Sequence, residues 1–156
     1  LLRFPAIALY YHACRFLSDP TAEAAFFAYQ HVLSGASALF PTDELRALYL
    51  LAINFGVKKS NEGADRKWYE ATFGLYEAAL ELELLFENGV LSRFAYHNIV
   101  GIAEHLGNID WAENFIHKYK NHLERRYREG AFNMNLARVA YARGDYRAAL
   151  LHLQQA

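Results

Sequence analysis

The sequence contains a single cysteine, Cys14, and only three prolines in 156 residues. A lone cysteine cannot form an internal disulfide, which excludes a disulfide-stapled secreted scaffold and favours a reducing compartment. No signal peptide is visible in the opening residues, so we expect a cytoplasmic protein. Position 1 is not Met and the last residues still follow a helical pattern, so we also expect the chain to be a piece of a longer protein.

The chain also lacks a large net charge, because 16 basic side chains balance 17 acidic ones. This balance gives no electrostatic footprint for nucleic acid, and we expect no nucleic-acid partner. The longest uncharged run, 24–42, is interrupted by Gly35 and Pro41, whereas a membrane span needs about 20 apolar residues, so we expect no membrane partner. Apolar residues make up 54% of the chain, a composition that packs a globular core.

Strand signals are scarce, because apolar residues such as Leu45, Leu48 and Ala52 recur at spacings of three and four rather than two. Pro, Gly, Ser and Asn residues mark the segment ends, including Asn88-Gly89, which we interpret as a turn between helices. We predict an all-α fold without strands, with four antiparallel pairs of helices. The predicted helices span about 5–17, 20–34, 43–59, 64–87, 90–106, 109–128, 131–143 and 145–156.

One segment occurs twice in altered form, as NIVGIAEHLGNIDWAENFI (98–116) and NLARVAYARGDYRAALLHL (135–153). In each copy an alanine lies four residues before the glycine of the expected turn. The same spacing recurs earlier in the chain, and the three pairs are Ala52 with Gly56, Ala103 with Gly107, and Ala140 with Gly144. Repeated helical hairpins of roughly this length are typical of helical solenoids.

The final segment resembles a tetratricopeptide (TPR) repeat, with Ala137, the Gly144-Asp145-Tyr146 turn, Ala149 and Ala156 at the positions of the family's pattern. The resemblance implies one domain over 1–156, an αα-superhelix (a right-handed solenoid) of about four TPR-like hairpins. The first half matches less well, so we expect it to be irregular. The helix expected at 64–87 is longer than the family's usual helices.

Motifs for catalysis or metal binding are missing. The sequence has no His-Glu-x-x-His, no Gly-x-Ser-x-Gly and no glycine-rich phosphate loop. Two pairs of glutamates at a spacing of four, Glu77 with Glu81 and Glu83 with Glu87, are expected on a solvated helix face. We expect no enzymatic activity, metal or cofactor. The opposing hypothesis is a compact helical enzyme or metal carrier, which stoichiometric bound metal would reveal.

The segment 117–130 is rich in Lys and Arg. Its cations are expected near the end of the helix at 109–128, where they complement the helix dipole. The alternative is a basic patch that pairs with an acidic partner, such as the glutamate-rich end of the helix at 64–87 in another copy.

In TPR superhelices the first helix of each pair lines the concave side, where side-chain amides hold extended peptides. Asn98 and Asn135, nine residues before their turn glycines, match positions that some members use in this way. The resemblance therefore implies a peptide groove, to which helical spacing adds four more residues. The candidate binding residues are Asn98, Asn135, Arg138, His105, Phe94 and Asn54.

In this groove the amides would bond the peptide backbone, Arg138 a carboxylate and Phe94 an apolar side chain. The competing interpretation is that both asparagines only cap or bridge helices. We predict a non-catalytic protein–protein interaction or scaffold domain. The alternative is a ligand- or peptide-sensing regulatory domain attached to an enzymatic or DNA-binding region outside this segment. Homo-oligomers through the end helices are a further hypothesis.

Overall fold

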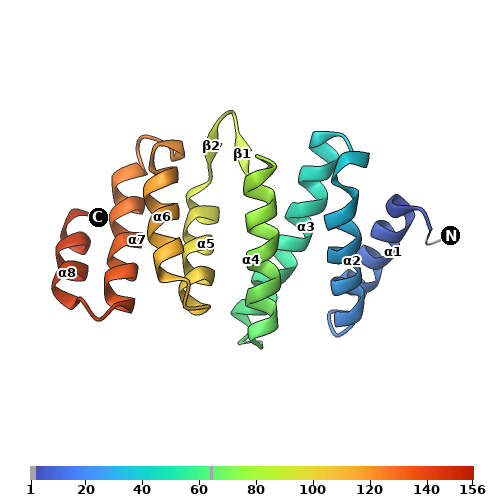
Figure 1. Cartoon of the computed structure of the whole chain (residues 1–156), viewed down its shortest axis with the longest axis horizontal. Coiled ribbons are helices and arrows are strands. Elements are labelled where there is room, and N and C mark those ends of the chain that lie inside the picture. Colours follow the sequence, from blue (N-terminus) through green and yellow to red (C-terminus); the bar gives the residue numbers. More distant parts are fainter. Residues whose placement is uncertain (1–2, 64) are drawn as a thin grey trace. The chain divides into compact units, whose positions relative to one another are not determined.

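The computed structural model describes residues 3–63 and 65–156, and these residues form an all-α fold (Figure 1). The prediction of eight α-helices is confirmed for this part of the chain. The elements are α1 (Pro5–Ser18), α2 (Glu23–Ala36), η1 (Ser37–Leu39), α3 (Thr42–Asn61), α4 (Arg66–Glu81), β1 (Phe86–Glu87), β2 (Val90–Leu91), α5 (Arg93–His105), α6 (Ile109–Tyr119), η2 (Lys120–His122), α7 (Arg128–Ala142) and α8 (Tyr146–Gln155). None of these helices is long and apolar enough to cross a membrane.

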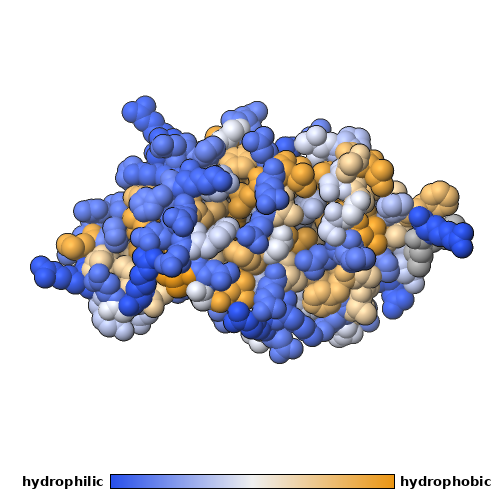
Figure 2. Space-filling model, in the orientation of Figure 1, coloured by the Kyte–Doolittle hydropathy of each residue, from blue (hydrophilic) through white to orange (hydrophobic). Residues whose placement is uncertain are grey.

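Contacts divide the chain into two compact units, Leu1–Phe55 and Gly56–Ala156. Each unit is described by itself, and the prediction of one domain over 1–156 stays a prediction. Figure 2 shows apolar patches interspersed with hydrophilic residues on the visible face, with mainly hydrophilic residues over α6 and α7.

The core of the first unit is a cluster of aromatic rings. Phe16 of α1 lies in the centre, with its ring centroid 5.5 Å from that of Phe26 and 4.8 Å from that of Phe55. Rings of this kind bury large apolar areas and favour tilted or edge-to-face contacts. The buried Tyr29 of α2 donates a hydrogen bond from its hydroxyl to the carbonyl of Leu48, at 2.8 Å. The cluster thus holds α1, α2 and the first part of α3 together.

In the second unit, α5 packs on α6 and α7 packs on α8, while α4 contacts α5 and α6 contacts α7. The buried Tyr96 of α5 donates from its hydroxyl to the carbonyl of Ile116, at 2.8 Å, which joins α5 to α6. Helix α7 contacts α5, α6 and α8. In α3, Gly56 lies so close to the buried Thr72 of α4 that a β-carbon there would overlap the threonine hydroxyl. This glycine therefore allows the two helices to approach closely.

The repeated alanine–glycine spacing has a structural cause at two of its three positions. Gly107 has φ +81°, and the N–H of Asn108 donates to the carbonyl of Ala103 at 2.8 Å. The same arrangement ends α7, with Gly144 at φ +80°. These are Schellman motifs, in which a left-handed glycine satisfies the last helical carbonyls. At the third position the predicted helix end is wrong, because Gly56 lies inside α3 and ends no helix.

The predicted helix over 64–87 is wrong at its C-terminal end. Helix α4 ends at Glu81, where Glu83 with φ +56° occupies the left-handed position. The N–H of Leu84 donates to the carbonyl of Ala79 at 2.8 Å, so the end is again of the Schellman type. The prediction of no strands is also wrong, because β1 and β2 pair around Asn88-Gly89. Both turn residues have positive φ, as a type I′ hairpin requires.

The predicted helix over 109–128 is also too long, because α6 ends at Tyr119 and η2 follows it. Lys118 lies in the last turn of α6 and Lys120 is its C-cap residue, as the dipole interpretation requires. Arg125, Arg126 and Arg128 lie beyond the end of the helix, and the dipole interpretation is wrong for them. Arg128 instead donates to the carbonyls of Asn121 and Leu123, both at 3.1 Å, and Lys120 pairs with Glu129 at 3.0 Å. These cations hold the connection between α6 and α7.

Candidate functional site

A groove of about 300 Å³ in the second unit contains three of the predicted binding residues, Asn98, His105 and Arg138. We call it the polar groove. It is formed by the end of α3, the first turn of α4, one face of α5 and a residue of α7. Its lining residues are Val57, Ser60, Asn61, Tyr69, His97, Asn98, Gly101, Ile102, His105 and Arg138.

Arg138 reaches from α7 onto α5. Its Nη2 lies 2.8 Å from a carboxylate oxygen of Glu104, and its Nε donates to the same oxygen at 3.1 Å. A β-carbon on Gly101 would lie 3.0 Å from the guanidinium. The absence of a side chain at this position therefore allows Arg138 to lie against α5. Within the described part of the chain, Arg138 makes no other ion pair or hydrogen bond, and the donors of Nη1 remain for a ligand.

The opposite wall of the polar groove is a stacked pair of rings. Tyr69 and His105 have centroids 3.6 Å apart and planes at 12°. The hydroxyl of Tyr69 donates to the carbonyl of Ser60 at 2.9 Å, which fixes the ring against the end of α3. This wall joins α3, α4 and α5, and presents a flat aromatic surface beside Asn98 and Arg138.

Asn98 is exposed in the polar groove and forms a hydrogen bond with the buried Tyr76. Burial raises the pKa of the Tyr76 hydroxyl, and a hydrogen bond with Asn98 partly opposes this shift. The exposed side chain of Asn98 leaves amide groups accessible from the groove. A peptide backbone offers the complementary donor and acceptor.

Asn135 is completely buried, unlike Asn98. Its amide nitrogen donates to the carbonyl of Ala131 at 2.8 Å and lies 2.9 Å from Nδ1 of His97. The amide oxygen has no hydrogen-bond partner among the described residues. Asn135 therefore bridges α7 to α5 behind the groove, as the competing interpretation from sequence describes.

The remaining two predicted residues lie outside the polar groove. Phe94 in the first turn of α5 is 66% exposed, and the guanidinium of Arg93 lies 4.9 Å from its ring centroid. It belongs to the same face of α5 as Asn98 and His105, at helical spacing. Asn54 is exposed and lies in the first unit.

Among residues 3–63 and 65–156, no three His, Cys, Asp or Glu side chains gather in a way that could hold a metal ion. Tyr29 and Tyr96 have pKa values far above that of free tyrosine because burial disfavours their charged forms. Both hydroxyls donate to backbone carbonyls, so they connect neighbouring helices in the core.

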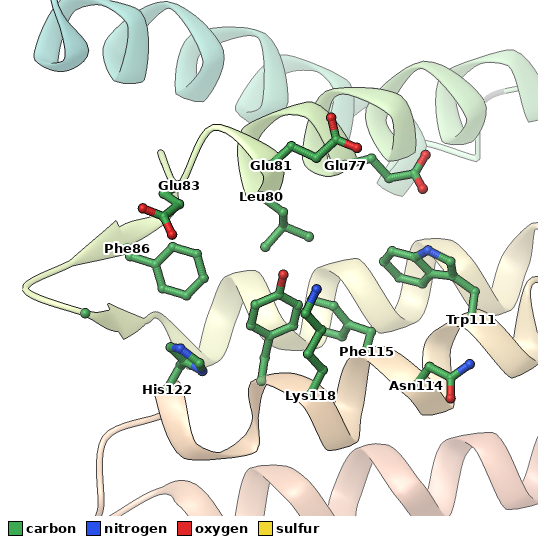
Figure 3. Close-up of a pocket in the computed structure, with 12 residues that line it drawn as sticks. Glu77, Leu80, Glu81, Glu83, Phe86, Trp111, Asn114, Phe115, Lys118 and His122 are labelled. Atoms are coloured by element: carbon green, nitrogen blue, oxygen red, sulfur yellow. The ribbon is translucent and has the colours of Figure 1, made fainter.

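A larger cavity, of about 810 Å³, was not predicted from the sequence. It lies between α4 and α6 beside the β-hairpin, and we call it the aromatic–acidic pocket (Figure 3). Helix α4 contributes to both cavities, with Tyr69 in its first turn and Glu77 and Glu81 near its end. The pocket is lined by Glu77, Leu80, Glu81, Glu83, Phe86, Gly89, Trp111, Asn114, Phe115, Lys118, Tyr119 and His122.

Two sequence signals mark this pocket. The aromatic residues Trp111, Phe115 and Tyr119 recur every four residues along α6, and the glutamates Glu77 and Glu81 do so along α4. An aromatic stripe at helical spacing is equally typical of a buried core face. That the stripe lines a cavity becomes visible only in the structure, where space is left between α4 and α6.

Comparisons of the chain with protein-family models, with curated proteins and with solved structures gave no significant match.

Proposed function

We propose that the chain is a TPR-like αα-superhelix of about four helical hairpins and a non-catalytic protein-interaction domain, which binds an extended peptide in the polar groove. One observation carries this proposal: Asn98, His105 and Arg138, predicted from sequence as binding residues, line one groove. They come from α5 and α7, the first helices of the last two pairs, which pack on each other.

The chemistry of the polar groove supports a peptide ligand. The exposed amide of Asn98 bonds a peptide group, and Nη1 of Arg138 bonds a carboxylate or a backbone carbonyl. The flat stack of Tyr69 and His105 receives an apolar or aromatic side chain. Phe94, exposed one turn before Asn98, extends the apolar contact along α5.

The proposal is tested by selecting unstructured peptides from a displayed library on the whole chain and measuring their affinities for variants. We expect Asn98→Ala and Arg138→Gln each to weaken the selected peptides by roughly five- to tenfold, the contribution of about one hydrogen bond. Thermal unfolding of Asn98→Ala should be nearly unchanged, because its side chain is exposed.

A matched control is Gln154→Ala, another exposed amide, in α8. It should leave the affinity unchanged. Asn54 lies in the first unit and does not line the polar groove, so Asn54→Ala should also leave the affinity unchanged. Selected peptides that bind equally well to wild type, Asn98→Ala and Arg138→Gln would contradict a ligand in the polar groove.

A further inference from the structure

The aromatic–acidic pocket has two walls of contrasting chemistry. Figure 3 shows Glu77, Leu80 and Glu81 on the side of α4, with Trp111 and Phe115 on the side of α6. The rings of Trp111 and Phe115 are nearly parallel, at 8°, with centroids 5.4 Å apart. The α6 side therefore presents an aromatic wall. Phe115 is buried within it, and the accessible ring surface comes from Trp111 and from Tyr119, whose ring lies 5.0 Å from that of Phe115 and is tilted by 45°.

The glutamates of this pocket lack the partners that other acidic residues have. In the second unit, the following Asp and Glu side chains each have an ion pair or hydrogen bond: Glu62, Asp65, Glu70, Glu104, Asp110, Glu113, Glu124, Glu129 and Asp145. Among the described residues of this unit, the exceptions are Glu77, Glu81, Glu83 and Glu87. Three of these four line the pocket.

Two of the unpaired carboxylates, those of Glu77 and Glu81, are close enough for the charge of one to act on the other. Desolvation by burial raises the pKa of Glu77, and the charge of Glu81 raises it further. Lys118 is the one Lys or Arg in the lining, and its ammonium lies 5.1 Å from the ring centroid of Tyr119. With three carboxylates against this ammonium, the lining carries net negative charge and favours a cationic ligand.

We propose that the aromatic–acidic pocket binds an arginine side chain of a partner polypeptide, with the guanidinium between the aromatic wall of α6 and the carboxylates of Glu77 and Glu81. A cation over aromatic faces with carboxylates beside it is stabilised by both groups. Arginine fits better than lysine because its flat guanidinium stacks on rings and bonds carboxylates in pairs, whereas an ammonium is a strongly hydrated point charge.

This site is independent of the polar groove, which lies at the other end of α4 and contains the ion pair of Arg138 with Glu104. The apolar side chain of Leu80, which Figure 3 shows pointing into the pocket, contacts the methylene stem of the arginine or an aliphatic neighbour in the partner. A cavity of about 810 Å³ has room for both.

The test uses a seven-residue capped peptide, Gly-Leu-Ala-Arg-Ala-Leu-Gly, and two versions with lysine or the neutral isostere citrulline in place of arginine. Binding is followed by NMR of the two tryptophan indole N–H signals. Trp111 lines the pocket, whereas Trp68 is buried and serves as an internal control. We expect the arginine peptide to shift only the Trp111 signal in a saturable way below about 1 mM, with citrulline at least about tenfold weaker and lysine in between.

Variants separate a specific site from general attraction to an acidic chain. Glu77→Gln with Glu81→Gln should weaken the arginine peptide about tenfold. The matched control, Glu70→Gln with Glu87→Gln, removes the same charge from residues outside the lining and should have little effect. Equal losses in both double variants, equal binding of the citrulline peptide, or no saturable shift of Trp111 would each overturn the proposal.

The arginine in the pocket could also come from a second copy of the chain, because the segment 117–130 carries several arginines. Sedimentation of the wild type and of the Glu77→Gln, Glu81→Gln variant decides this point. We expect both to be monomers at the concentrations used for NMR. A wild-type dimer that dissociates in the variant would replace the partner polypeptide with a second copy and overturn the proposal as stated.

Discussion

The two cavities at opposite ends of α4 differ in how far their own residues satisfy one another. In the polar groove, Arg138 is paired with Glu104, and Asn135 bridges the helices from behind. In the aromatic–acidic pocket, three glutamates have no partner in the described residues of the second unit, and the charge of Glu81 adds to burial in raising the pKa of Glu77. A charged group that is paired inside the molecule contributes to stability, whereas like charges without an internal partner lower it.

This difference predicts which substitutions act on stability and which act on binding. Changes behind the polar groove should lower the free energy of unfolding, because they break internal bonds. Changes in the aromatic–acidic pocket should leave it the same or raise it, because they remove repulsion or strain. The following predictions test this contrast from the largest expected effect to the smallest.

The largest difference is expected between the two asparagines. Asn135→Ala removes a buried amide that joins α7 to α5 and leaves Nδ1 of His97 and the carbonyl of Ala131 without this donor. We expect a loss of about 2 kcal/mol in the free energy of unfolding. The exposed Asn98→Ala should change it by no more than about 0.5 kcal/mol. Urea unfolding measures both, and equal values would show that the two asparagines have the same structural role.

A smaller effect is expected at the ends of the helices. Glu83 holds the left-handed position that Gly107 holds at the end of α5. A left-handed residue with a β-carbon costs about 1 kcal/mol, so Glu83→Gly should stabilise the chain by about this amount and Gly107→Ala should destabilise it equally. Thermal unfolding of both variants shows whether each one is more or less stable than the wild type. A Glu83→Gly variant less stable than the wild type would mean that the carboxylate makes a favourable contact, and the contrast between the cavities would be lost.

These helix ends also show what the sequence can predict. The spacing of Ala103 and Gly107 predicted a helix end correctly, because glycine adopts the left-handed conformation of a Schellman motif at little cost. The same spacing failed at Gly56, where the glycine permits close packing on Thr72 inside a continuous helix. Local sequence does not distinguish these two uses of glycine, since the second depends on a helix elsewhere in the chain.

The end of α4 was missed for the opposite reason. Glu83 occupies a position where glycine is usual, so the helical pattern continues past the true end. Asn88-Gly89, a strong signal for a type I′ turn, was interpreted as a turn between helices because no alternating pattern flanks it. The hairpin has only two residues in each strand, too few for a period of two to be visible.

For the binding residues, helical spacing was sufficient to collect Asn98 and His105 on one face of α5. Spacing cannot tell how far a side chain is covered by the next helix, and Asn135 therefore proved to be buried. The aromatic–acidic pocket depends on the gap between α4 and α6, which only tertiary packing determines. Of the glutamates predicted on a solvated face, Glu81, Glu83 and Glu87 are exposed as expected. Only Glu77 is partly enclosed, with burial as the first cause of its raised pKa.

The smallest expected effect compares one glutamate from each cavity. Glu104→Gln removes the partner of Arg138, a partly exposed ion pair that contributes about 0.5 kcal/mol. Glu77→Gln removes repulsion from Glu81 at helical spacing, which costs a few tenths of a kcal/mol. The two variants carry the same change of charge and of shape, so the general charge of the chain has an equal influence on both.

We therefore expect opposite signs, with Glu104→Gln less stable and Glu77→Gln slightly more stable than the wild type in urea unfolding at low salt. Salt should reduce both differences, because it screens attraction and repulsion alike. If both variants were destabilised, Glu77 would have a favourable partner inside the molecule. Glu77 would then be paired inside the molecule, as Arg138 is with Glu104, and a cation from outside would relieve no repulsion in the pocket.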